Sequence, residues 1–216
     1  MKEPMDTPAL FPVSLHLHGK CCLVVGGDKM AETRVHTLLA CEAVVRLVSP
    51  QVTPGLATLA QRGAIQWEQG PVQPGHLTAV AVVFVTTQDP QIGAQVATLA
   101  QQQPCLVHMT DNPAQSDFSL PAVVRRGPLT LAISTAGQAP AFAAWLRKQL
   151  ERLLDHRLGQ VVEAYARLRP SMKQRYPDLS TRAQAWEELL TAHPPALFST
   201  AHTEPPPAKQ HHTTHR

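Results

Sequence analysis

A short apolar run that breaks into glycines and continues as a helix-like pattern constrains this sequence more than any other feature. It reads Leu23-Val24-Val25-Gly26-Gly27-Asp28-Lys29-Met30-Ala31. A buried strand that turns sharply on glycine and enters a helix is how dinucleotide-binding folds hold a pyrophosphate at the helix N-terminus. The fingerprint G-x-G-x-x-[G/A] is met at its first and last positions, by Gly26 and Ala31. The sequence therefore predicts a cofactor-binding turn near the start of a domain.

Asp28 replaces the middle glycine of that fingerprint and brings a negative charge to the place where phosphates would bind. Two like charges about 4 Å apart repel by roughly 1 kcal/mol in water and by several in a drier cleft. Asp is also a preferred helix N-cap, and Lys29 beside it offers a compensating charge. We therefore expect weakened affinity for a dinucleotide, with Gly26, Gly27, Asp28 and Ala31 as cofactor-binding residues.

Apolar runs alternate with helix-like segments through the first half of the chain. Strands are expected at 21–25, 44–48, 64–67, 79–85 and 105–109, and helices at 31–41, around Leu56 and at 92–99. This alternation is typical of βαβ units in a doubly wound parallel sheet, whose ligand crevice lies at the carboxyl ends of the strands.

The residues that follow the second and fourth expected strands should line that crevice on the cofactor side. They are Ser49, Pro50, Thr86 and Thr87. An NAD-selective site often has an acidic residue after the second strand, where this chain has Ser49. The sequence therefore leaves the choice between NAD and NADP open.

Asp111 follows the last expected strand of this sheet. A carboxylate there can accept a proton or hold a cationic group. Thr110-Asp111-Asn112-Pro113 is equally a good turn sequence, so an Asx turn is an alternative of the same weight. His108 should face the opposite side of the strand and is expected to be structural.

The pattern changes after Asp111. Two further strands are expected at 118–124 and 129–134, then an amphipathic helix at 139–154 and a charged helical region from 158 to about 190, broken at Pro170 and Pro177. The link from Ser134 to Pro140 combines hydroxyls, glycine and proline at a helix start, a pattern that either binds an anion or caps the helix. The Pro-, His- and Thr-rich tail has no core-forming pattern.

Composition excludes several classes of function. A net charge of +3 is too small to predict nucleic-acid binding, although the basic residues gathered between 125 and 175 could meet a polyanion or form a solvated helix face. No apolar run has the length of a membrane span, and the N-terminus does not resemble a signal peptide. The 4 cysteines lack C-x-x-C spacing, and the 11 histidines form no H-E-x-x-H motif, so no bound metal is expected.

Several segments in fixed order carry a family resemblance. They are Phe11-Pro12-Val13, the glycine turn with Ala31, Asp111-Asn112-Pro113, Phe118-Ser119-Leu120-Pro121-Ala122, the run from Arg126 to Thr135, and Gly137-Gln138-Ala139-Pro140. Together they resemble the precorrin-2 dehydrogenase / sirohydrochlorin ferrochelatase family, the N-terminal module of sirohaem synthases. The resemblance is strongest from about residue 9 to residue 155.

The resemblance implies a Rossmann-like doubly wound parallel sheet, a small β/α dimerisation region and a helical C-terminal domain. The corresponding expected parts are a dinucleotide-binding domain at 1–113, a dimerisation and active-site region at 114–154, a helical domain at 155–192 and a disordered tail at 193–216. It also implies a cytoplasmic homodimer that uses NAD to oxidise precorrin-2 to sirohydrochlorin. Some members are also lyases that take ferrous iron as a substrate and insert it to give sirohaem.

The same resemblance implies catalytic roles for Asp111 and Ser134 beside the tetrapyrrole. Precorrin-2 carries eight carboxylates, so basic and hydroxyl groups near Ser134 are expected to bind it. These substrate-binding residues are Arg126, Thr135, Gly137 and Arg147.

Three departures from the family pattern fall on the cofactor side: Asp28 for a glycine, His108 for an asparagine, and Thr87-Gln88-Asp89 in the loop after the fourth strand. They keep two alternatives open. One is a chelatase or tetrapyrrole-binding protein with weakened cofactor binding. The other is a non-enzymatic dinucleotide sensor, which leaves the segment from Arg126 to Pro140 unexplained.

Overall fold

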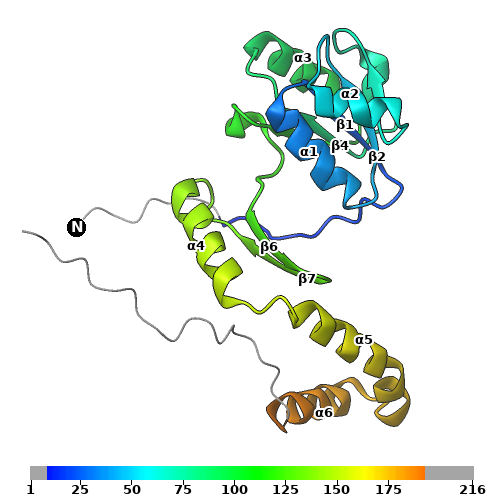
Figure 1. Cartoon of the computed structure of the whole chain (residues 1–216), viewed down its shortest axis with the longest axis vertical. Helices are drawn as coiled ribbons and strands as arrows, with labels where there is room; N and C mark the ends of the chain where they lie inside the picture. Colours follow the sequence, from blue (N-terminus) through cyan, green and yellow to red (C-terminus); the bar gives the residue numbers. More distant parts are fainter. Residues whose placement is uncertain (1–8, 193–216) are drawn as a thin grey trace, which may run out of the picture. The chain divides into compact units, whose positions relative to one another are not determined.

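The computed structural model describes residues 9–192, and the predicted tail at 193–216 lies outside them (Figure 1). The chain divides into two compact units between Ser119 and Leu120. This division falls within the segment that the sequence analysis assigns to the dimerisation and active-site region.

The first unit is built on a parallel sheet with the strand order β3-β2-β1-β4-β5. The strands are β1 (Cys21–Val25), β2 (Val44–Val48), β3 (Gln66–Glu68), β4 (Val82–Val85) and β5 (Leu106–Met109). β1 pairs with β2 on one side and with β4 on the other, so chain order reverses between β1 and β4. This is the topological switch point of a doubly wound sheet, and the predicted Rossmann-like α/β fold is confirmed.

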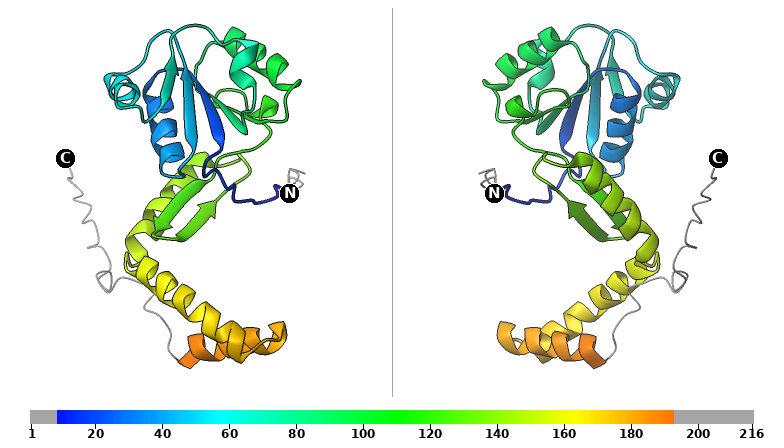
Figure 2. Two further views of the ribbon diagram at one scale, coloured as in Figure 1. Left: turned by 90° about the vertical axis from the view of Figure 1, so that its right-hand side faces the viewer. Right: turned by 90° about the vertical axis from the view of Figure 1, so that its left-hand side faces the viewer.

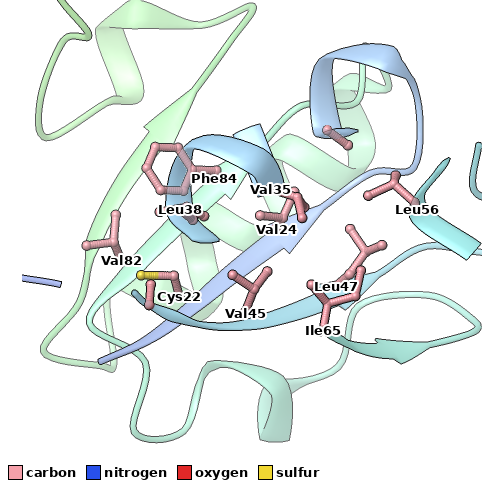
Figure 3. Close-up of a cluster of buried hydrophobic side chains, with 12 residues drawn as sticks. Cys22, Val24, Val35, Leu38, Val45, Leu47, Leu56, Ile65, Val82 and Phe84 are labelled. Atoms are coloured by element: carbon pink, nitrogen blue, oxygen red, sulfur yellow. The ribbon is translucent and has the colours of Figure 1, made fainter. Parts of the chain in front are cut away.

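Helices cover both faces of this sheet (Figure 2). They are α1 (Lys29–Leu39), α2 (Pro54–Gln61) and α3 (Pro90–Ala100), with the 3₁₀ turns η1 (Pro74–Leu77) and η2 (Pro113–Gln115). Side chains alternate along β1, so Cys22 and Val24 join the cluster under α1 and α2, and Leu23 and Val25 join the cluster under α3 (Figure 3). A strand buried on both faces needs a continuous apolar sequence, which explains why the run before Gly26 has no polar residue.

The second unit contains an antiparallel pair of strands followed by three helices. They are β6 (Ala122–Arg126), β7 (Leu129–Ile133), α4 (Pro140–Leu153), α5 (Leu158–Arg175) and α6 (Leu179–Ala192). Gly127 turns the β-hairpin with φ +58°, and a Cβ there would lie 3.0 Å from the Gly159 Cα atom. These two glycines allow the hairpin turn to lie directly against the start of α5.

One prediction for the helical region is wrong, because α5 continues through Pro170. Proline cannot donate a hydrogen bond to the carbonyl of Ala166 one turn earlier. Both residues are exposed, so water can hydrate that carbonyl and the helix persists. The break at Pro177 is confirmed: α5 ends at Arg175, and Asp178 accepts a hydrogen bond from the backbone of Thr181 (2.8 Å) as α6 begins.

None of the helices between residues 9 and 192 is both long enough and apolar enough to cross a membrane.

Candidate active site

The glycines between β1 and α1 are required by two other loops that meet them there. Gly26 has φ +125°, and a Cβ on it would lie 2.4 Å from the Thr86 Oγ1 atom at the end of β4. A Cβ on Gly27 would lie 1.9 Å from the backbone oxygen of Gln51, in the loop after β2. Three strand ends therefore converge on a turn that has no room for side chains.

Asp28 is the N-cap of α1. Its Oδ1 atom accepts a hydrogen bond from the backbone N–H of Ala31 (2.9 Å). The charge of Lys29 does not compensate it, because the Lys29 ammonium pairs with Glu32 (2.8 Å). The Asp28 carboxylate thus uses one of the first N–H groups of the helix, the groups that bind phosphates at such turns.

The hydroxyl groups at the ends of β2 and β4 donate hydrogen bonds to backbone carbonyls of neighbouring loops and strands. Ser49 is buried and donates to the Gln51 carbonyl (2.7 Å), whereas Pro50 is exposed. Thr86 is buried and donates to the Val25 carbonyl (3.2 Å). Ser49 and Thr86 therefore hold the loops around the turn in place.

A pocket of about 160 Å³ lies where β4 and β5 end. Thr87, Asp89 and Asp111 contribute to its lining, and the Asp111 side chain is exposed. Thr87 Oγ1 accepts a hydrogen bond from the backbone N–H of Asp89 (3.2 Å), and Asp89 in turn caps α3 through Gln91 (2.9 Å). The structure thus brings together Thr87 and Asp111, which the sequence analysis assigned separately to cofactor binding and catalysis.

Two residues missed by the sequence analysis fix the loop that carries Asp111. The Ser116 hydroxyl oxygen accepts a hydrogen bond from the backbone N–H of Met109 (2.9 Å). The Asp117 carboxylate accepts one from the backbone N–H of Val107 (2.7 Å). Ser116 and Asp117 therefore hold the loop against the edge of β5, and no local sequence motif marks this role.

The other predicted catalytic residue, Ser134, lies in the second unit, in the link between β7 and α4. Its Oγ atom accepts a hydrogen bond from the backbone N–H of Ala136 (3.2 Å), and the side chain is exposed. Thr135 Oγ1 accepts one from the N–H of Ala139 (3.1 Å), where α4 starts. Ala136 and Gly137 both have positive φ, at +51° and +78°. This link is a sharp left-handed turn that exposes the Ser134 hydroxyl.

The two predicted substrate-binding arginines have partners within the second unit. Arg126 donates to the carbonyls of Glu151 and Leu154 at the end of α4. Arg147 forms an ion pair with the Glu151 side chain, one helical turn away. The hairpin register pairs Arg126 with Leu129 at the turn, whereas Ser134 follows the opposite end of β7. The structure therefore does not bring Arg126 to Ser134.

Among residues 9–192, no cluster of three or more His, Cys, Asp or Glu side chains has the arrangement of a metal site.

Comparison with known proteins identifies both parts of the chain. Residues 13–122 match the family described as putative NAD(P)-binding, and residues 126–153 match the central domain of sirohaem biosynthesis proteins. The chain is 37% identical over 187 residues to a siroheme synthase of Xylella fastidiosa, which covers 86% of this chain and 39% of the relative. It is 38% identical over 181 residues to siroheme synthase 1 of Aeromonas salmonicida, with 84% and 39% covered.

A solved structure extends the similarity to the fold. The precorrin-2 dehydrogenase SirC superimposes with a TM-score of 0.70 and 25% sequence identity, covering 84% of this chain and 89% of SirC. By contrast, the chain spans about two fifths of the length of the siroheme synthases that it matches.

Proposed function

Because this chain belongs to the precorrin-2 dehydrogenase and sirohaem synthase family, we propose that it oxidises precorrin-2 to sirohydrochlorin with NAD as hydride acceptor. The observation that carries the proposal is the pocket at the ends of β4 and β5, which Thr87 and Asp111 both line. It lies beside the switch point of the sheet, where doubly wound folds bind their ligands. The reaction takes place in the cytoplasm and supplies sirohaem biosynthesis.

The residues of the β1–α1 turn fit the pyrophosphate of NAD. Gly26 and Gly27 are partly buried and bring no side chains to the turn, and the N-terminus of α1 follows directly. Pro50 and Thr87 border the same edge of the sheet, while Ser49 and Thr86 support the loops from within. When bound, NAD supplies the acceptor for the hydride and its two electrons.

Asp111 accepts the proton that the substrate loses in this oxidation. Loss of a hydride leaves one proton to be removed, and a carboxylate at the exposed rim of the pocket can take it and release it to water. Ser134 and Thr135 offer hydroxyl groups for the macrocycle, at the turn made by Ala136 and Gly137. Arg126 and Arg147 act mainly by holding α4, since their guanidinium groups already contact Glu151.

We infer that the protein works as a homodimer. On α4, Phe142 and Trp145 are 55% and 53% exposed, and their rings stack with centroids 5.7 Å apart. Aromatic side chains gathered on an exposed helix face are typical of protein–protein interfaces. A second copy of the chain covers this face.

The test is an anaerobic assay of the purified protein with precorrin-2, with and without NAD, followed by the absorbance of sirohydrochlorin. Conversion that requires NAD supports the dehydrogenase. A second assay adds ferrous iron to sirohydrochlorin and measures the appearance of sirohaem above the rate without protein.

A chelatase or tetrapyrrole-binding protein with weak cofactor affinity is the second candidate. The observation that favours it is the Asp28 carboxylate, which occupies the Ala31 N–H at the cofactor turn. In the same assay it predicts bound tetrapyrrole without NAD-dependent oxidation.

A further inference from the structure

One arginine of the first unit has no polar partner in the part of the chain that the structure describes. Arg34 lies on α1 and is partly buried, and among residues 9–192 it makes no hydrogen bond or ion pair. Its Nε atom is fully buried and unsatisfied. The guanidinium carbon lies 5.0 Å from the centroid of the Phe84 ring, a cation–π contact that satisfies none of the N–H donors.

The surroundings of Arg34 are aromatic and contain no negative charge that it uses. The rings of Phe84, His108 and Phe118 lie with their centroids 5.5 to 6.0 Å apart. Burial and the neighbouring Arg34 cation lower the pKa of His108, so the imidazole is neutral near pH 7. Asp117 is the acidic residue nearest in sequence to this cluster, and its carboxylate is hydrogen-bonded to Val107.

A second partly buried arginine in the same unit, Arg46, has polar partners. Arg46 on β2 donates to the His76 carbonyl (3.0 Å) and lies 3.6 Å from the Glu68 carboxylate. The Nε atom of Arg46 is also buried without a hydrogen bond, but residues 9–192 supply an acceptor for its Nη1 atom and a nearby counter-charge, and they supply neither for Arg34. Burial lowers the pKa of Arg34, which means that the protein alone does not stabilise this charge.

We propose that Arg34 binds a carboxylate arm of the tetrapyrrole, with Phe84, His108 and Phe118 as an apolar wall beside the ion pair. This inference rests on the proposed function, because it takes the ligand from it. The two Nη atoms of Arg34 are not buried as Nε is, and they would donate two parallel hydrogen bonds to a carboxylate. The aromatic rings keep water away from the pair and strengthen it.

The proposed subsite and the Asp111 pocket lie on opposite faces of the sheet. Arg34 and Phe84 are on the side of α1, whereas Val85, Met109 and α3 line the pocket. His108 precedes Asp111 by three residues, so their backbones lie at most about 10 Å apart, and a macrocycle near Asp111 must extend one arm across the carboxyl end of the sheet to reach Arg34. Oxidation leaves the arms unchanged, so Arg34 binds substrate and transition state equally and acts on affinity and specificity.

The experiment compares Arg34→Gln with Arg62→Gln, which removes the same charge from an exposed position. The probes are uroporphyrin III, which has eight carboxylates, and coproporphyrin III, which has four; binding is measured by fluorescence titration. Arg34→Gln should weaken uroporphyrin III binding about tenfold, as expected for one lost charged hydrogen-bonded pair, and Arg62→Gln should leave it unchanged. Arg34→Lys should give an intermediate loss. With precorrin-2, KM should rise at Arg34→Gln while kcat and the Kd for NAD stay the same.

An unchanged Kd for uroporphyrin III in folded Arg34→Gln overturns the inference. If Arg34→Gln changes the oligomeric state measured by sedimentation but not that Kd, the inference is also overturned, because the partner of Arg34 would then be a carboxylate of a second copy. If wild-type protein fails to oxidise precorrin-2 but Arg34→Gln still weakens uroporphyrin III binding, the dehydrogenase proposal fails and the carboxylate subsite stands. If wild-type protein oxidises precorrin-2 but Arg34→Gln binds uroporphyrin III normally, the dehydrogenase proposal stands and the carboxylate subsite fails.

Discussion

The two units differ in how far each completes its own core. The first unit buries side chains on both faces of its sheet, and Leu23 and Leu47 are fully inaccessible to solvent. In the described part of the second unit, the buried hydrophobic residues are Val124, Ala143 and Leu158. Larger side chains on α4 remain exposed there. The first unit therefore encloses a core of its own, whereas the described part of the second unit buries few apolar side chains.

The same contrast holds for the polar groups of the candidate site. In the first unit, buried hydroxyls such as that of Thr86 fix the loops, and Asp111 is left exposed in a pocket. In the second unit, Arg126 and Arg147 hold the hairpin and helix together. We infer that the first unit carries the reactive carboxylate on a rigid frame, and that the second contributes binding groups once its apolar face is covered.

The largest expected effect tests whether the chemistry resides in the first unit. Asp111→Asn should lower kcat for precorrin-2 oxidation by about 10²- to 10⁴-fold, because the amide cannot accept the proton. Anaerobic turnover measures the loss, and thermal unfolding should be unchanged because Asp111 is exposed. Asp89→Asn in the same pocket is the matched control, since an amide oxygen can still cap α3. Equal losses in both variants, or a wild-type rate in Asp111→Asn, would contradict the assigned role.

A pair of truncations tests the difference between the cores. Leu47→Ala should destabilise the first unit by about 3 kcal/mol, because it leaves a cavity in a closed cluster. Trp145→Ala should cost less than about 1 kcal/mol in dilute protein, since the side chain is half exposed there. Hydrogen exchange resolved by segment measures both units in one experiment.

Measuring hydrogen exchange at several protein concentrations tests whether a second copy covers α4. Protection of α4 should rise with concentration in the wild type and stop rising in Trp145→Ala, while protection of β1 should not depend on concentration. If Trp145→Ala costs as much as Leu47→Ala in dilute protein, the α4 face is already covered within one chain.

Most of the fold can be predicted from the sequence, because helices and strands follow from local residue preferences and from the periodic spacing of apolar residues. A Val-rich run such as Val82–Val85, apolar throughout, is typical of a strand buried on both faces, and the β4 bounds lie within the predicted segment. Pro170 is a position where this kind of prediction fails. A proline removes one hydrogen bond, but the exposed carbonyl that it frees is hydrated, and the rest of α5 outweighs the loss.

The site is less predictable because a side chain's role depends on partners that are distant in the sequence. The need for glycine at 26 comes from Thr86, 60 positions later. Arg126 and Arg34 are alike as residue types, yet the carbonyls at the end of α4 accept hydrogen bonds from the first, while among residues 9–192 the second contacts only the Phe84 ring. No local pattern distinguishes a structural arginine from an unpaired one.

Acid should affect the second unit through Asp155, which lies between α4 and α5. Hydrogen bonds from the Arg157 side chain and backbone lower the pKa of Asp155 from 3.8 to about 2. A lowered folded-state pKa stabilises the protein above the unfolded value, so this stabilisation is complete above about pH 4 and is lost as pH falls towards 2. Helical circular dichroism during urea titrations at pH 4.5 and 2.5 should show a smaller difference in Asp155→Asn than in the wild type. An identical pH dependence would mean that other carboxylates, such as Asp178, determine the acid response.

The smallest effect concerns the turn where the first unit departs from the fingerprint. Asp28→Gly should tighten NAD binding by on the order of 1 kcal/mol, because it removes a charge beside the phosphates and frees the Ala31 N–H. It should destabilise α1 by only a few tenths of a kcal/mol, since glycine is a tolerated N-cap.

Asp28→Asn separates the two causes: it removes the charge but can keep the cap. Isothermal titration with NAD should rank affinity as Gly above Asn above Asp. Equal affinity for Asn and Asp would mean that the occupied N–H, and not the charge, limits binding. Equal affinity for all three would mean that the pyrophosphate does not approach α1, and the first unit would then use its closed, rigid sheet for the tetrapyrrole alone.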